Sequence, residues 1–114
     1  MSKDSLRSAQ NTLAAEAAGL TQLAASLDAD FVAAIDLIAG AKGRLIISGM
    51  GKSGHIGNKI AATMASTGTP AYFVHPAEAS HGDLGMITQD DVVLGLSWSG
   101  GTQELGGLLN YLKR

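Results

Sequence analysis

The residues with the clearest potential for chemistry are the glycines, lysine and serine between positions 49 and 54, which read Gly-Met-Gly-Lys-Ser-Gly. They follow the apolar run Leu45 to Ser48, which is too short for a helix and predicts a buried strand. After them, apolar residues recur at helical spacing, which predicts a helix from about Ser53 to Thr67. A glycine turn between a strand and a helix gathers unpaired N–H groups at the positive end of the helix dipole. Such a point suits an anionic group, most often a phosphate.

Three kinds of phosphate site compete for this turn, and spacing separates them. A P-loop is excluded, because residues 51–53 match its end but Ile46 stands where its first glycine is required. The dinucleotide fingerprint is matched by three glycines: Gly49, Gly51 and Gly54. The second predicted strand, residues 71–74, ends in His75 rather than in an acidic residue that would hold a ribose, so NAD binding is disfavoured but stays open. The third kind is a sugar phosphate site, completed by a second serine-rich loop.

That second loop carries three hydroxyl groups around two glycines at the start of a predicted helix: Ser97, Ser99 and Thr102. Hydroxyl and backbone N–H donors can surround the oxygens of a phosphate without a fixed positive charge. The alternative is a helix cap in a tight turn, for which one hydroxyl is enough. Three hydroxyls exceed that need, so we predict that this loop binds phosphate.

Composition excludes several other classes of protein. With 114 residues the chain is one domain at most, and 46% apolar residues allow a core of its own or one shared with a partner. A net charge of −2, without a basic run, argues against nucleic acid as a partner. The chain has no cysteine for disulfides or thiol chemistry. No apolar run is long enough for a signal peptide or a membrane span, so we expect a cytoplasmic protein.

Two helices are predicted before the glycine turn, in a helical segment at 1–42. Leucines recur every seven residues in the first helix: Leu6, Leu13, Leu20 and Leu27. They give the helix one apolar stripe, which packs either on its own domain or on a second subunit. Asp28 is a suitable cap for the second helix, which Gly40 closes. Residues 43–114 form the predicted core.

The core alternates strands and helices. Its three predicted strands are Leu45 to Ser48, Ala71 to Val74 and Val92 to Leu96. Each is a continuous apolar run, which is typical of a parallel sheet covered on both faces. The fold class is therefore α/β, with the ligand expected at the carboxyl ends of the strands.

Three segments of the chain resemble a known family. They are Gly49 to Gly57 (GMGKSGHIG), Ala65 to Pro70 (ASTGTP) and His75 to Met86 (HPAEASHGDLGM). The resemblance is to the sugar isomerase (SIS) domain of arabinose-5-phosphate isomerases, and it runs from about residue 43 to 112. It implies a three-layer αβα sandwich of flavodoxin-like architecture. It also implies a homotetramer, with active sites shared between subunits, that interconverts D-arabinose 5-phosphate and D-ribulose 5-phosphate for Kdo and lipopolysaccharide synthesis.

The resemblance also assigns roles to residues. Those placed around the phosphate are Ser53, Ser97, Ser99 and Thr102, and those assigned to the active site are Lys52, His81 and Glu104. The family's serine loop usually has a glutamate where this chain has Gly101. Family members also continue with a later glutamate and histidine of the active site, and commonly with CBS modules, which this sequence lacks. We therefore expect an incomplete domain that, by itself, binds phosphosugar weakly and isomerises it poorly.

The chemistry of such an isomerisation limits the roles that these residues can take. It needs a base for a carbon-bound proton and a cation or acid for the enediolate. Glu104 is a candidate base, Lys52 a candidate for the oxyanion, and His81 a candidate proton carrier. A solvated lysine and a first-turn glutamate remain the structural alternatives.

No cofactor is expected, and no metal is predicted to be required. Four residues of one loop are metal-ligand types: His75, Glu78, His81 and Asp83. Their spacing matches no familiar zinc pattern. Two rival functions stay open, a phosphosugar sensor without catalysis and a dinucleotide-binding domain.

Overall fold

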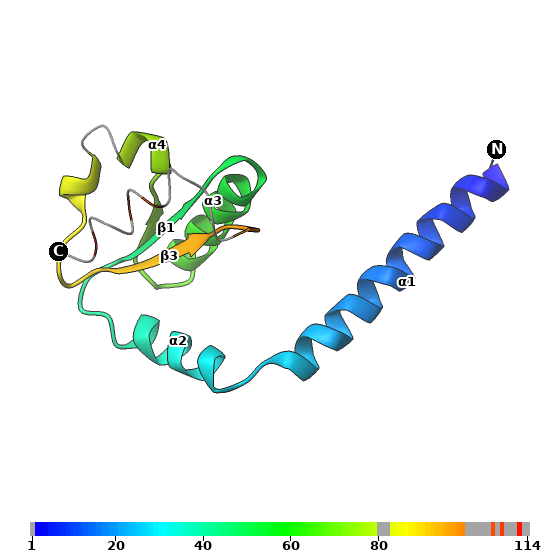
Figure 1. Cartoon of the computed structure of the whole chain (residues 1–114), viewed down its shortest axis with the longest axis horizontal. Helices are drawn as coiled ribbons and strands as arrows, with labels where there is room; N and C mark the ends of the chain where they lie inside the picture. The colour runs from blue at the N-terminus through cyan, green and yellow to red at the C-terminus, as the bar shows by residue number, and fades with distance from the viewer. Residues whose placement is uncertain (1, 80–82, 100–105, 107, 109–111, 113–114) are drawn as a thin grey trace. The chain divides into compact units, whose positions relative to one another are not determined.

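The computed structural model describes residues 2–79, 83–99, 106, 108 and 112 (Figure 1). The chain divides into two compact units, Met1–Asp36 and Leu37–Arg114, which we describe separately. The boundary lies inside helix α2 (Ala29–Ala39).

The first unit consists of helix α1 (Ser2–Ser26) and the beginning of α2. The predicted cap of α2 is confirmed, because Oδ1 of Asp28 accepts the N–H of Asp30 at 2.9 Å. None of the four leucines of the stripe is buried. Those within α1 are 60–68% exposed, and Leu27, which lies just beyond the end of α1, is 50% exposed. Within its own unit, the stripe therefore presents apolar surface rather than a packed core.

The second unit is built on a three-stranded sheet with the order β2-β1-β3. Its strands are β1 (Leu45–Gly49), β2 (Ala71–Phe73) and β3 (Val92–Leu96), and both pairings are parallel. Helix α3 (Gly51–Ser66) connects β1 to β2 and begins two residues before the predicted start. The predicted α/β class with a parallel sheet is confirmed, and each predicted strand end lies within one residue of the observed end.

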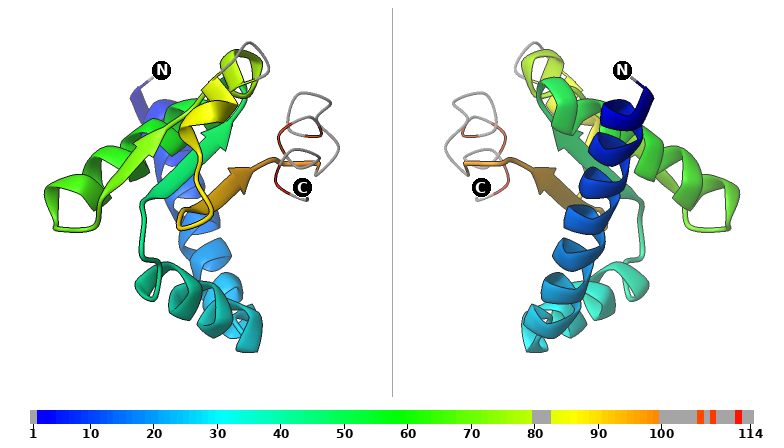
Figure 2. Two further views of the ribbon diagram at one scale, coloured as in Figure 1. Left: turned by 90° about the vertical axis from the view of Figure 1, so that its left-hand side faces the viewer. Right: turned by 90° about the vertical axis from the view of Figure 1, so that its right-hand side faces the viewer.

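The two faces of β1 bury different sets of side chains, and α3 lies along one of them (Figures 1 and 2). On the α3 face, the buried cluster is Leu45, Ile47 and Ala61. On the opposite face, the buried cluster is Ile46, Val74, Ile87 and Leu108. β1 is buried along its whole length and forms the centre of the unit. The glycine turn follows directly from its carboxyl end.

Two short helical elements stand where the sequence predicts only a loop between β2 and β3. They are α4 (Pro76–Ala79) and the 3₁₀ helix η1 (Asp83–Met86). Proline suits the first position of α4, and Nδ1 of His75 accepts the N–H of Ala77 at 3.2 Å. Histidine is not among the usual capping residues, which is why the pattern gave no helix signal here. Of the predicted C-terminal helix, the structure describes three residues, Gly106, Leu108 and Leu112, and all three are helical.

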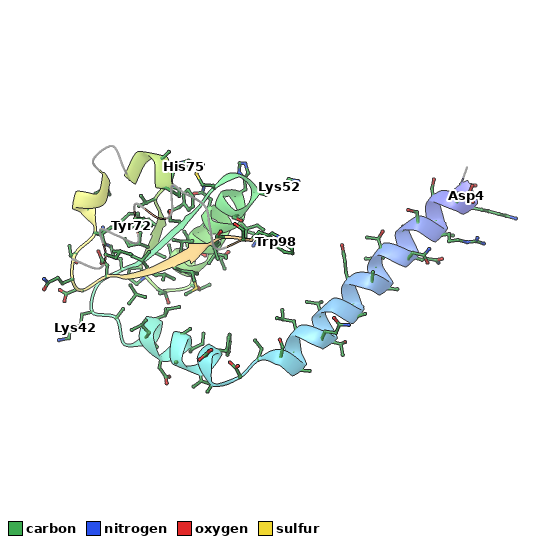
Figure 3. All side chains as sticks on the ribbon, in the orientation of Figure 1. Asp4, Lys42, Lys52, Tyr72, His75 and Trp98 are labelled. Atoms are coloured by element: carbon green, nitrogen blue, oxygen red, sulfur yellow. The ribbon has the colours of Figure 1, made fainter. Side chains whose placement is uncertain are left out.

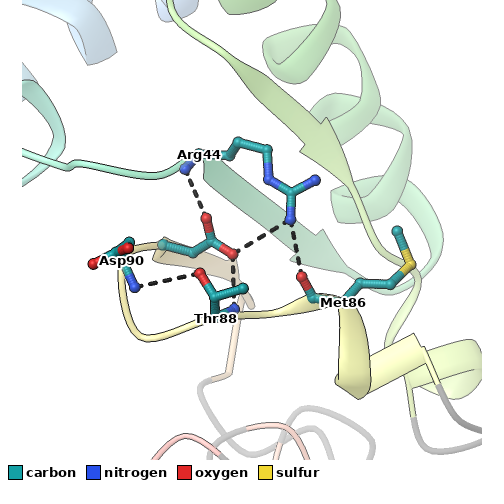
Figure 4. Close-up of polar contacts among 5 residues, drawn as sticks. Arg44, Met86, Thr88 and Asp90 are labelled. Carbon is teal, nitrogen blue, oxygen red and sulfur yellow. Dashed lines mark hydrogen bonds and ion pairs between the residues drawn. The ribbon is translucent and has the colours of Figure 1, made fainter.

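A closed set of polar contacts holds the amino end of the sheet (Figure 4). The Asp91 side chain is 2% exposed and accepts the N–H of Arg44 at 2.7 Å and that of Thr88 at 2.9 Å. The Arg44 guanidinium lies 3.5 Å from the same carboxylate and donates to the Met86 carbonyl at 2.9 Å. Its carbon Cζ also sits 4.5 Å from the centre of the Tyr72 ring. Burial raises the pKa of Asp91, but the two N–H bonds and Arg44 outweigh it, so that the pKa lies below its ordinary value.

Candidate functional site

At the glycine turn, the start of α3 packs closely against the end of β1. A Cβ atom on Gly54 would lie 2.6 Å from the carbonyl oxygen of Gly49, and one on Gly49 would lie 3.1 Å from the carbonyl oxygen of Leu96. Gly51 is the first residue of α3 and has a φ of +57°, a value that residues other than glycine rarely adopt. The glycine spacing therefore lets the first turn of α3 sit directly against the carboxyl ends of β1 and β3.

The amino end of α3 is open to a ligand. Its N-cap residue, Met50, has extended backbone angles and makes no side-chain capping bond. The first N–H groups of a helix have no partner within the helix, and they carry its partial positive charge. Lys52 lies in the same turn with its side chain exposed. This arrangement favours an anion at the carboxyl ends of the strands.

A hollow of about 330 Å³ lies beside this turn. Its lining comes from the first half of α3, the end of β3 and the residues that follow β3: Ser53, Ile56, Gly95, Leu96, Ser97 and Trp98. Lys52 and Trp98 both lie at the carboxyl ends of the strands (Figure 3). Two of the four predicted phosphate-binding residues, Ser53 and Ser97, thus line one hollow, as expected for parallel strands.

The other predicted site residues are placed less completely. Lys52 and the exposed Ser99 are not among the residues that line the hollow. His81, Thr102 and Glu104 lie outside the described residues. The roles given to all of these residues remain predictions.

The possible metal set is also only partly covered. Among the residues that the structure describes, no three histidine, aspartate or glutamate side chains gather closely enough to hold a metal ion. His75 uses Nδ1 to accept the Ala77 N–H, and its ring meets that of Phe73 edge-on, with centroids 6.4 Å apart. The position of His81 is not described, and the same holds for the side chains of Glu78 and Asp83.

Sequence reasoning assigned no part in the site to three residues near the turn. Ser48 is completely buried and donates to the Val74 carbonyl at 2.6 Å. Trp98 is fully exposed at the hollow, and Ile56 is 58% exposed beside it. A signal existed for Ser48, because a hydroxyl inside a buried strand needs a hydrogen-bond partner. The exposed Trp98 is the single tryptophan of the chain, which is a signal by itself.

Comparison with protein families matches residues 37–114 to the SIS domain. The chain belongs to the SIS domain family. The match begins in the last part of α2 and includes β1, β2, β3, the glycine turn and the hollow. Of the helices that the structure describes, none combines the length and hydrophobicity that a membrane span requires.

Relatives of this SIS domain chain include two arabinose 5-phosphate isomerases. It is 59% identical over 111 residues to KdsD of Pseudomonas aeruginosa, and this match covers 97% of this chain and 34% of that protein. It is 55% identical over 113 residues to GutQ of Escherichia coli K12, and this match covers 99% of this chain and 35% of that protein. The chain thus spans about a third of the length of these relatives.

A solved structure shares the fold. The protein c3406 of E. coli CFT073, in complex with arabinose 5-phosphate, superposes with a TM-score of 0.91 at 40% sequence identity. The superposition covers 97% of this chain and 59% of that one.

Proposed function

We propose that the protein containing this chain is a cytoplasmic arabinose-5-phosphate isomerase. It interconverts D-arabinose 5-phosphate and D-ribulose 5-phosphate and supplies Kdo synthesis for lipopolysaccharide. The observation that supports it most directly is the hollow lined by Ser53 and Ser97 at the uncapped start of α3. That geometry suits a phosphate. The choice of arabinose 5-phosphate as the substrate rests on the names of the relatives.

In this proposal, the glycine turn and the hydroxyl groups hold the phosphate. The N–H groups of the first α3 turn point toward the anion, and Ser53 and Ser97 donate from two neighbouring elements. Ser99 and Thr102 complete the set from the loop after β3. Because hydroxyl and N–H donors carry no full charge, the phosphorylated product can leave readily.

Catalysis then requires two proton transfers between neighbouring carbons and oxygens. In the aldose-to-ketose direction, Glu104 removes the proton from C2, which forms an enediolate, and the proton is returned to C1. His81 moves the second proton from the oxygen on C2 to the oxygen on C1. Lys52, on the exposed first turn of α3, stabilises the negative oxygen of the enediolate.

The test uses the full-length protein and its Lys52→Met variant. NMR would follow ribulose 5-phosphate formed from arabinose 5-phosphate. We expect the substitution to lower kcat by about 10² to 10³, which is the typical effect of removing one oxyanion-stabilising group. The matched control is Lys59→Met, an exposed lysine on the same helix, which should keep wild-type turnover. A wild-type protein that melts at a higher temperature with NAD, but not with arabinose 5-phosphate, would reject the proposal in favour of a dinucleotide site.

The second part of the proposal is that α1 packs against α1 or another face of a second copy of the chain. Support comes from its exposed leucine stripe, since a stripe of this size is rarely left in water. Leu13→Asp places a charge in the stripe and should shift sedimentation toward the monomer. Ala15→Asp places it on the opposite side of α1 and should not. An unchanged assembly in the Leu13 variant would show that the stripe lies outside the interface.

A further inference from the structure

Ser48 is the one polar residue among the fully buried side chains that the structure describes. It stands in β1 between Ile47 and the first glycine of the turn, in a strand whose other side chains are apolar. Its hydroxyl donates to the Val74 carbonyl at 2.6 Å, a short bond inside the core. An apolar residue would fill the same position without the need for a partner, so the bond itself requires an explanation.

The bond acts where β2 leaves the sheet. The last residue pair between the strands is Ile47 with Phe73. Beyond it, two bonds keep Val74 against β1: its N–H donates to the Ile47 carbonyl at 2.9 Å, and its carbonyl accepts from Ser48. Both sides of the Val74 residue are therefore fixed to β1 just before the chain turns into α4.

The residue that follows this anchor is His75. Its ring is held by the Ala77 N–H at Nδ1 and by the edge-on contact with Phe73. With Nδ1 acting as acceptor, Nε2 is the nitrogen that carries the proton of the neutral ring. His75 lies at the carboxyl ends of the strands, as Lys52 does (Figure 3).

We propose that Ser48 is a positioning residue that ties His75 to the glycine turn. Ser48 directly precedes the turn that begins at Gly49, and its hydroxyl holds the peptide that enters His75. This anchoring keeps the His75 ring at the carboxyl ends of the strands, where the glycine turn also lies. The effect of this arrangement on turnover rests on the proposed isomerase function, whereas the anchoring of His75 does not.

The experiment compares Ser48→Ala with Ile46→Val in the full-length protein. Both changes remove a small group from fully buried positions on the same face of β1, so they serve as matched losses of packing. Mass spectrometry would measure hydrogen exchange in the peptide that contains residues 74–79. We expect Ser48→Ala to raise exchange there about five- to tenfold over Ile46→Val, as expected for one lost buried bond.

Kinetics and binding give the readouts that a general loss of stability would not produce. Ser48→Ala should lower kcat about tenfold and change its pH profile, while inorganic phosphate still protects the glycine turn from exchange. Ile46→Val should leave kcat and its pH profile unchanged. Equal exchange at residues 74–79 in the two variants would overturn the inference, and so would raised exchange with an unaltered kcat. An inactive wild-type protein would reject the isomerase proposal alone, because the exchange comparison still decides whether Ser48 anchors His75.

Discussion

The two ends of the sheet use polar groups in opposite ways. At the amino end, the Asp91 carboxylate is 2% exposed and accepts two N–H groups while it pairs with Arg44. At the carboxyl end, α3 starts without a side-chain cap, and Ser53 and Ser97 line an open hollow. The same sheet thus carries one end whose polar groups bind one another and one end where an uncapped helix start lies beside a hollow.

This difference separates structure from chemistry within one unit. Buried charge is tolerated only where it is paired and hydrogen-bonded, so the contacts of Asp91 are expected to stabilise the fold and nothing more. The first N–H groups of α3 have no partner within the helix and no side-chain cap, so they are available to an anion. Changes at the amino end should therefore alter stability alone, whereas changes at the carboxyl end should also alter ligand binding.

The largest expected effect is at Gly54. A Cβ at this position would lie 2.6 Å from the Gly49 carbonyl oxygen, so Gly54→Ala forces β1 and α3 apart. We expect a loss of about 3 kcal/mol in the free energy of unfolding, measured by urea denaturation, because the nearest atoms belong to the backbone and cannot move aside easily. Phosphate protection of the folded protein should fall with it, since the first turn of α3 is displaced.

Gly85→Ala is the control for this substitution. A Cβ there would meet nothing within 4 Å, so stability should stay within about 0.5 kcal/mol of the wild type. If Gly54→Ala were as stable as Gly85→Ala, the close approach that shapes the carboxyl end would not exist in solution.

A smaller effect, on stability alone, is expected at the amino end. Asp91→Asn replaces one acceptor oxygen with an NH₂ group that faces the N–H donors of Arg44 or Thr88. We expect a loss of about 2 kcal/mol at neutral pH, typical of a buried charge-assisted bond left unmade, with no change in phosphate binding. Asp90→Asn, at the exposed neighbouring side chain, should change stability by less than about 0.5 kcal/mol.

The pH dependence of this loss has a definite sign. Because the pKa of Asp91 is lowered in the folded state from its ordinary value of 3.8, its ionised form stabilises the protein above that value. That contribution disappears as the pH falls through the folded value. The difference between wild type and Asp91→Asn should therefore shrink in acid, and a difference that stayed constant from neutral to acidic pH would show that ionisation is not its cause.

The features that sequence could predict are those with local patterns. Apolar runs located all three strands, and the spacing of Gly49, Gly51 and Gly54 located the turn. The network of Arg44 and Asp91 was beyond reach, because its partners are 47 residues apart and no periodicity links them. The start of α3 at Gly51, a residue with a φ of +57°, depends on backbone geometry that an apolar pattern does not show.

The site divides along the same line. Ser53 and Ser97 could be selected as candidates because they stand near glycines, and a phosphate loop is a local sequence motif. Both line the hollow. Ser48 carries an equally simple side chain, but its partner is supplied by another strand. Its position therefore depends on the register between β1 and β2, and register is not a local property of the sequence.

The smallest expected effect compares two glycines at opposite ends of α3. Gly51 has a φ of +57° and Gly68 a φ of +103°, and at both a Cβ would meet nothing within 4 Å. Alanine at either position should therefore cost about 1 kcal/mol of stability, through backbone strain alone. Only Gly51 shapes the N–H groups of the first α3 turn, so only Gly51→Ala should weaken binding of inorganic phosphate, measured by calorimetry. An equal loss of phosphate affinity in both variants would mean that phosphate binding depends on overall stability and not on the geometry of the turn. The two ends of the sheet would then not differ in ligand binding.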